Sequence, residues 1–151
     1  MTRVSGEMEA ADREVLADKV GSVVTRYFQD AFLGGDYPRS DFGDAFATFT
    51  AGARARAARD KVLLTNIRLG PAIEHVVARR QTAYLSVLSP YRVAAGVTAK
   101  VELRYLAVRG DERDQRVRVQ GRLLLTRDGA GGWVIFGYDL SRSVGPAGKE
   151  S

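Results

Sequence analysis

Three segments in the C-terminal third of the chain decide the fold: VTAKVELRYLAV (Val97–Val108), RVRVQGRLLLT (Arg116–Thr126) and WVIFGYDL (Trp133–Leu140). In each segment, apolar and polar side chains alternate with a period of two, which is how a β-strand presents its two faces. Short segments rich in glycine and aspartate separate the three, and such segments favour tight turns. The stretch therefore predicts an antiparallel meander with one apolar face and one polar face.

Alternation also assigns the side chains of the meander to its two faces. The residues predicted to face the core are apolar: Val97, Ala99, Val101, Leu103, Tyr105, Ala107, Val117, Val119, Leu123 and Leu125. The residues predicted to face outward include the basic residues Lys100, Arg104, Arg116, Arg118 and Arg122. Glu102 lies among them and can pair with them across strands. Gly121 interrupts the apolar set in mid-strand, where glycine commonly marks a bulge, a bend or a close approach of other atoms.

A long amphipathic helix precedes the sheet. Apolar residues recur at spacings of three and four from Leu16 to Phe32, which predicts a helix over residues 12–33. Asp12 and Glu14 lie near its N-terminus, where negative charge favours the helix dipole. Gly34-Gly35 is expected to end the helix, because glycine accepts the left-handed cap conformation.

Shorter elements connect this helix to the meander. Ser40 is a candidate N-cap for a second, short helix that buries Phe42, Phe46 and Phe49, and Thr50 is the N-cap candidate of a third helix over residues 51–60. Residues 67–69 are expected to form a short extended piece. Residues 72–88 predict a strand, or two strand pieces that meet near residues 79–81, and residues 89–92 predict a turn.

The chain has 151 residues, enough for one domain with its own core. We expect a flexible N-terminus at residues 1–11, a single domain at residues 12–144 and a flexible tail at residues 145–151. The absence of cysteine excludes disulfides, thiolate catalysis and cysteine-based metal sites. The N-terminus lacks the apolar core of a signal peptide, and no apolar run reaches membrane-spanning length. This predicts a cytoplasmic protein with no membrane segment; the alternative is the soluble part of a membrane-anchored extracytoplasmic protein.

Charge is unevenly distributed along the chain, whose net charge is +5. Residues 1–60 hold 8 basic and 10 acidic side chains, whereas residues 61–151 hold 15 basic and 8 acidic ones. A basic half favours an anionic partner, whether nucleic acid, membrane surface or acidic protein. The alternative is a solvated basic face of the sheet without a partner.

The order of the predicted elements indicates an α+β fold with helices packed on one face of an antiparallel sheet. Three stretches then resemble the nuclear transport factor 2-like superfamily, the cystatin-like group that includes ketosteroid isomerases and polyketide-cyclase-like proteins. They are VTRYFQDAFLGGD (Val24–Asp36), the run of Phe42, Phe46 and Phe49, and GGWVIFGYD (Gly131–Asp139). A long helix ending in a Gly-Asp turn, a phenylalanine-bearing short helix and a last strand that begins Gly-Gly-Trp are typical of that superfamily. The resemblance covers about residues 15–141.

The resemblance implies a strongly bent sheet that wraps the helices and leaves a conical cavity between them. In this superfamily the cavity is the usual functional site. Its implied lining is aromatic: Tyr27, Phe28, Phe46, Tyr105, Trp133, Phe136 and Tyr138. His75 and Asp139 are the polar candidates. Spacing leaves open which of the aromatic side chains enclose a cavity and which fill it.

Isomerase-type members place a carboxylate base in this cavity, with a tyrosine or an acid that holds the enolate oxygen. Tyr27 lies on the first helix, where such a tyrosine is expected. The base of the family follows the second helix, but here residues 50–59 contain no carboxylate, and Asp60 is the first. Because that base is missing, isomerase or cyclase chemistry by Tyr27, His75 and Asp139 is the alternative hypothesis.

The sequence contains no complete motif for other chemistry. His75 is the single histidine, so it cannot build a histidine-based metal site, and as a neighbour of Ile73 and Val77 in alternation it is expected to be an ordinary strand residue. The glycine-rich segment at 129–132 lies in a predicted hairpin, without the following helix that a phosphate-binding loop needs. We therefore predict no metal and no cofactor.

The leading hypothesis is a non-catalytic module that binds a protein partner or a small apolar ligand and forms a homodimer. The outward basic residues of the meander are the predicted interface, because arginine is enriched at protein interfaces. Nucleic-acid binding is disfavoured, because sheet platforms for nucleic acids interleave aromatic residues with the basic ones and the outward positions of the meander hold none.

Overall fold

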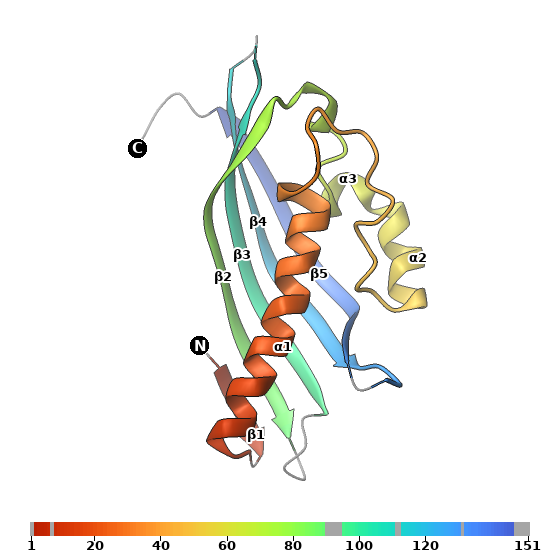
Figure 1. Ribbon diagram of the computed structural model, residues 1–151, viewed down its shortest axis with the longest axis vertical. Helices are drawn as coiled ribbons and strands as arrows, with labels where there is room; N and C mark the ends of the chain where they lie inside the picture. The colour runs from red at the N-terminus through yellow and green to blue at the C-terminus, as the bar shows by residue number, and fades with distance from the viewer. Residues whose placement is uncertain (1, 7, 90–94, 111–112, 131, 147–151) are drawn as a thin grey trace.

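The computed structural model describes residues 2–6, 8–89, 95–110, 113–130 and 132–146, together forming an α+β fold (Figure 1). The helical elements are α1 (Ala10–Phe28), a π-helical turn (Gln29–Leu33), α2 (Ala51–Arg59), α3 (Lys61–Leu64) and a 3₁₀ turn (Gly70–Ala72). The strands are β1 (Thr2–Gly6), β2 (His75–Ser89), β3 (Gly96–Val108), β4 (Gln115–Arg127) and β5 (Trp133–Pro146). The long helix, the short helix expected over residues 51–60 and the antiparallel sheet are present.

The sheet has the strand order β1-β2-β3-β4-β5, and β2 to β5 form the predicted antiparallel meander. Its two ends, β1 and β5, do not pair with each other, so the sheet is open. Figure 1 shows α1 lying along one face of the curved sheet, with α2 and α3 beside β5. Within the described residues, no helix covers the opposite face of the sheet, which we call the outer face.

Helix α1 buries one stripe of apolar side chains against the sheet, as its periodicity predicts. The stripe consists of Leu16, Val20, Val24, Tyr27 and Phe28. The helix begins two residues earlier than expected, and its last expected turn widens into the π-helical turn. Gly34 then leaves the helix in an extended conformation and Gly35 takes a φ of +86°, which confirms the predicted end.

Donors from elsewhere in the chain satisfy the carbonyl groups at the end of this helix, which have no partner within it. Arg39 donates through Nη2 to the carbonyl of Asp30 at 2.7 Å and through Nη1 to that of Gly34 at 2.9 Å. The backbone N–H of Asn66 donates to the carbonyl of Ala31 at 2.9 Å. The guanidinium of Arg39 also lies 4.0 Å from the centre of the Phe42 ring. One arginine thus ties the loop after α1 to the helix end.

The prediction of a second, short helix that begins after Ser40 is wrong. Residues 43–48 form successive turns whose hydrogen bonds span three residues, and the segment ends where Phe49 bridges Ile135 of β5. The backbone of Thr50 and Thr48 pairs with that of Ile135, so strand-like pairing at the sheet edge competes with helix formation. The phenylalanines of the segment are nevertheless buried, as expected. Residues 67–69 form a turn and not the expected extended piece.

The next helix matches its prediction. Thr50 accepts a hydrogen bond from the backbone N–H of Ala53 through Oγ1 at 3.2 Å, which confirms it as the N-cap of α2. A separate short helix, α3, follows Asp60 and ends at Leu64.

Both ends of the chain hold more regular structure than expected. Residues 2–6, expected to be flexible, form β1, which pairs in parallel with β2 from Thr2–Leu85 to Gly6–Ser89. Strand β5 continues to Pro146, beyond the expected limit of the domain. The local sequence pattern predicts neither extension, because each of these segments forms a strand only by pairing with a neighbouring strand. Residues 147–151 and most of the turn expected at residues 89–92 lie outside the described residues.

Two predicted irregularities are confirmed. The pairing of β2 with β3 shifts between Ala78 and Arg80, which is where two strand pieces were expected to meet. Gly121 has a φ of +141°, and a Cβ atom there would lie 2.0 Å from the carbonyl oxygen of Asp139. Gly121 therefore allows β4 and β5 to approach each other closely in mid-strand.

Candidate functional site

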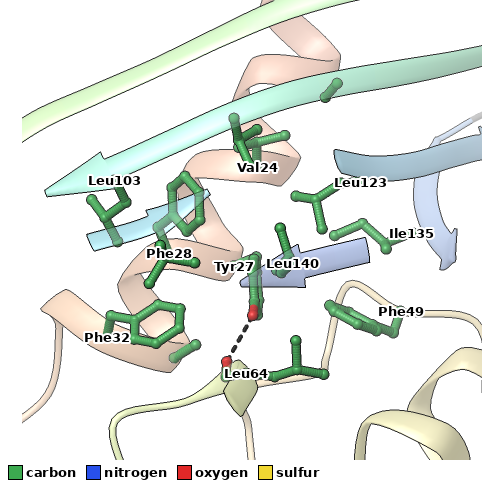
Figure 2. Close-up of a cluster of buried hydrophobic side chains, with 14 of the residues drawn as sticks. Val24, Tyr27, Phe28, Phe32, Phe49, Leu64, Leu103, Leu123, Ile135 and Leu140 are labelled. Atoms are coloured by element: carbon green, nitrogen blue, oxygen red, sulfur yellow. Dashed lines mark hydrogen bonds between the residues drawn. The ribbon is translucent and has the colours of Figure 1, made fainter. Parts of the chain in front are cut away.

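Most of the aromatic side chains expected to line a cavity are core residues, and Figure 2 shows two of them, Tyr27 and Phe28, among the buried side chains of the core. Among them, Tyr27, Phe28, Phe46, Tyr105 and Trp133 are buried. The ring centre of Tyr27 lies 5.6 Å from that of Phe28 and 5.2 Å from that of Phe49, and both distances are within the range of favourable aromatic pairs. The structure therefore places these rings where they contribute to the hydrophobic core.

The hydroxyl of Tyr27 is committed to a structural hydrogen bond. Its Oη donates to the carbonyl oxygen of Leu64 at 2.7 Å, so this group at the end of α3 has a partner. Burial raises the pKa of Tyr27 well above its ordinary value, and the nearby Tyr138 and Tyr105 add to this. A neutral hydroxyl held by a backbone carbonyl is suited to joining α1 to α3.

The structure does not bring the candidate catalytic residues together. In the β4–β5 register Asp139 is opposite Arg122, so its side chain lies on the outer face, on the other side of the sheet from Tyr27. His75 is exposed at the start of β2, opposite Val108. The three groups proposed for isomerase chemistry thus lie in three different environments.

The remaining two aromatic candidates lie at the edge formed by β5. Phe136 lies at a register shift of β5 and is 42% exposed. Tyr138 is half-buried and donates to Oδ2 of Asp60 at 2.6 Å. Burial and this hydrogen bond to the Asp60 carboxylate raise the pKa of Tyr138 to about 12.

A polar chain that the sequence did not reveal joins the end of α1 to β5. Arg142 donates through Nη2 to Oδ1 of the buried Asn66 at 3.0 Å, and Asn66 donates to the hydroxyl of Tyr37 at 3.3 Å. Tyr37 in turn donates to the carbonyl of Phe32. Burial raises the pKa of Tyr105 on β3, and the neighbouring Arg142 opposes this. Arg142 lies on β5 two residues beyond Leu140, where the last strand was expected to end.

The outer face carries the predicted basic residues in rows that cross the strands. In antiparallel strands, paired residues share a face, so the register defines each row. One row consists of Arg80, Arg104 and Arg118 on β2, β3 and β4. A second row consists of Tyr84, Lys100, Arg122 and Asp139. Glu102 lies in the row between these two.

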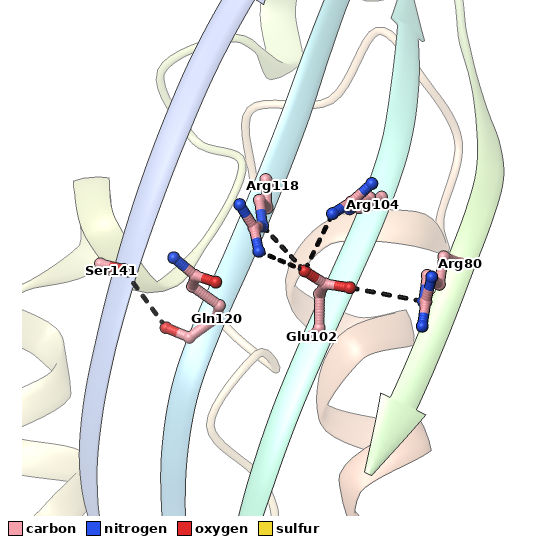
Figure 3. Close-up of polar contacts among 6 residues, drawn as sticks. All are labelled: Arg80, Glu102, Arg104, Arg118, Gln120 and Ser141. Atoms are coloured by element: carbon pink, nitrogen blue, oxygen red, sulfur yellow. Dashed lines mark hydrogen bonds and ion pairs between the residues drawn. The ribbon is translucent and has the colours of Figure 1, made fainter.

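Glu102 binds all three arginines of the first row (Figure 3). Its Oε2 lies 2.6 Å from Nη2 of Arg118 and 3.3 Å from Nη2 of Arg104, and its Oε1 lies 3.4 Å from Nε of Arg80. Partial burial of Glu102 disfavours its charge, but Arg118 and Arg104 outweigh this and lower its pKa. One carboxylate therefore neutralises part of three positive charges.

The outer face is also hollowed. A depression of about 600 Å³ lies over β2 to β5, and its lining includes Arg80, Glu102, Arg118, Arg122 and Asp139. Its flank is apolar on one side, where Tyr84 and Leu88 are 50% and 55% exposed. The face thus combines positive charge with exposed apolar surface.

Sequence reasoning missed the contribution of β2 to this face. Arg80 and Tyr84 were not among the predicted interface residues, because the register shift near Arg79 reverses which positions of β2 point outward. The signal was present in the change of alternation before and after residues 79–81. The predicted interface residues Lys100, Arg104, Arg116, Arg118 and Arg122 are all exposed.

Within the described residues, no three His, Asp or Glu side chains are grouped so that they could hold a metal ion. The helices of this part of the chain also lack the combination of length and apolar character that a bilayer crossing requires. The chain matches no protein-family model, no curated protein and no solved structure.

Proposed function

We propose that this protein is a non-catalytic interaction module whose binding surface is the outer face of the sheet. The observation that carries the proposal is the contrast between the two faces. The helix-covered face is packed with its own aromatic rings, and the hydroxyl of Tyr27 is held by Leu64. The outer face exposes a row of arginines beside a depression of about 600 Å³.

The distribution of titratable groups supports a binding role over catalysis. The isomerase-type alternative needs a base and a group that holds the enolate oxygen within reach of one substrate. Tyr27 lies in the core, whereas Asp139 and His75 are exposed to solvent. Charged surfaces of the outer-face kind are suited to recognising a partner of complementary charge.

The fold proposal is that of a nuclear transport factor 2-like domain. It is supported by a long helix lying along one face of a curved antiparallel sheet, with the short helices beside β5 (Figure 1). In this proposal the cone between helices and sheet is filled by side chains of the protein itself. The predicted homodimer belongs to the same proposal, with a second copy as one candidate partner for the outer face.

Single-site labelling tests the location of the binding surface. Because the chain has no cysteine, Gln120→Cys on the outer face and Ala55→Cys on the exposed side of α2 each accept one bulky label. We expect the label at position 120 to block binding of charged peptides, measured by fluorescence anisotropy, and to block whatever self-association sedimentation across a concentration series detects. The label at position 55 is the matched control.

The opposing result is an interior ligand site. Trp133 is the only tryptophan and is buried, so its fluorescence reports on the helix-covered side of the sheet. An apolar small molecule that raises the Tm and changes Trp133 emission, regardless of the label at position 120, would show that the cone is a pocket. That outcome would overturn the proposed function.

A further inference from the structure

We infer that the outer face binds an acidic polypeptide, a protein segment rich in Asp and Glu with apolar residues beside them. This inference rests on the proposed function, because it names the partner of the same surface. It is argued from the charge of the face, from the geometry around Glu102 and from the apolar flanks.

The charge of the face is strongly asymmetric. On β2 to β5, six basic residues identified by the register point outward: Arg80, Lys100, Arg104, Arg116, Arg118 and Arg122. The acidic residues at outward positions of the same strands are Glu102 and Asp139. Like charges directly opposite one another on neighbouring strands are destabilising. The protein therefore keeps a repulsive row of arginines on its surface, which a negatively charged partner would relieve.

The arginines around Glu102 retain unused hydrogen-bonding capacity. Each guanidinium has five N–H donors in a planar fork, and a carboxylate can accept two of them at once. Arg80 approaches Glu102 through Nε at 3.4 Å, and Arg104 approaches it through Nη2 at 3.3 Å. Their side chains are 55% and 48% exposed, so other donors of each fork are accessible. Glu102 holds the forks close together, in the position that carboxylates of a partner require.

Lys100 and Arg122 extend this surface by one row. They are opposite each other in the β3–β4 register, and both line the depression. In the described part of the chain, neither forms an ion pair. A partner with two or more acidic residues could therefore contact both rows.

The flanks favour a polypeptide over other anions. Tyr84, which lines the depression, and Leu88 further along β2 are 50% and 55% exposed, and a protein partner buries such apolar surface while its acidic residues pair with the arginines. Nucleic acid fits less well, because Glu102 and Asp139 oppose a continuous phosphate chain and no aromatic residue separates the arginines of the row. A second copy fits less well, because a two-fold contact would press one basic face against the other.

Peptide binding tests the inference. The probe is a fluorescent synthetic peptide of alternating Glu and Leu, compared with an alternating Lys and Leu peptide and with a single-stranded oligonucleotide of the same net charge as the acidic peptide. Anisotropy is measured at low and at physiological salt. We expect the intact chain to prefer the acidic peptide. Glu102→Gln should tighten its binding several-fold, because the variant removes the internal competitor for three arginines.

Two charge reversals and a matched control locate the site. Arg118→Glu and Arg122→Glu should each weaken binding of the acidic peptide by about tenfold or more. Arg122 lies outside the Glu102 cluster, so it serves if the Arg118 variant is poorly folded by circular dichroism. Arg13→Glu on the exposed side of α1 makes the same change in net charge and should leave binding nearly unchanged.

The possible failures are distinguishable. A chain that prefers the oligonucleotide, or that loses as much affinity in the Arg13 variant as in the Arg118 variant, overturns the acidic-polypeptide inference. If sedimentation shows a dimer that Arg118→Glu dissociates, while the peptide does not bind, the partner is a second copy; the inference fails and the proposed function stands. If the outer-face variants change neither peptide binding, oligonucleotide binding nor mass, both proposals fail.

Discussion

The hydroxyl of Tyr27 donates a 2.7 Å hydrogen bond to the carbonyl oxygen of Leu64, 37 positions further along the chain (Figure 2). Both residues are fully buried. The bond joins the last turn of α1 to the end of α3, and it places a phenol that resembles a catalytic group in a structural role.

Removing that hydroxyl should therefore cost stability. We expect Tyr27→Phe to lower the free energy of unfolding by about 1–3 kcal/mol, because the Leu64 carbonyl loses its partner in a buried site. Urea unfolding monitored by Trp133 fluorescence measures the change. Tyr84→Phe, on the exposed outer face, is the control and should be nearly neutral. Equal stability of Tyr27→Phe and the native chain would contradict the structural role.

Replacing either of two glycines with alanine should change the stability of the protein, in opposite directions at the two positions. Gly121→Ala should destabilise the protein by roughly 1–3 kcal/mol from backbone strain alone, and further from the clash with Asp139. Gly52→Ala in α2 meets no atom within 4 Å and should stabilise the protein by up to about 1 kcal/mol through helix propensity. Thermal unfolding of both variants tests the pair. If Gly121→Ala leaves the stability unchanged, β4 and β5 do not approach each other as closely as the structure shows.

Arg39 should not be replaceable by lysine. Arg39→Ala should lower stability by about 2 kcal/mol, because two carbonyl groups at the end of α1 lose a charged donor. Arg39→Lys should recover only part of this, since one ammonium cannot reproduce the planar fork. Chemical unfolding compares these variants with Arg68→Ala, an exposed control. Full rescue by lysine would indicate that charge alone matters.

The Glu102 cluster should make a pH-dependent contribution to stability. Because folding lowers the pKa of Glu102 below its ordinary value of 4.5, its contribution is fully present above that pH and is lost as the pH falls through the folded value. We expect Glu102→Gln to be less stable than the native chain at pH 7 by no more than about 1 kcal/mol, since the arginines are half-exposed. The difference should vanish in acid. A difference that persists or grows at low pH would contradict this assignment, and high salt should reduce it at pH 7.

The sequence was sufficient for the elements whose pattern is local. The stripe from Leu16 to Phe28 repeats at helical spacing, and Val97 to Leu125 alternates at strand spacing, so each element follows from its own residues. Thr50 predicted the start of α2 because an N-cap acts within a few residues of itself. The same locality made the outward direction of Arg104, Arg118 and Arg122 predictable.

Elements that depend on a distant partner were not predictable in this way. Residues 2–6 form a strand because they pair with the edge of β2. Residues 42–49 do not form a helix, because Phe49 pairs with Ile135 of β5. The roles of the candidate site residues depend on the same kind of contact. Asp139 lies on the outer face because its pairing with Arg122 sets it there.

The amino-acid sequence by itself determined the α+β class, the position of the meander and the basic character of one sheet face, because periodicity and charge are properties of neighbouring residues. Tertiary structure alone decided that the aromatic rings pack into the core, that Tyr27 binds Leu64, and that Arg80 joins Arg104 and Arg118 around Glu102. Those outcomes require residues far apart in sequence to meet, and the free energy of such contacts depends on the whole packed arrangement.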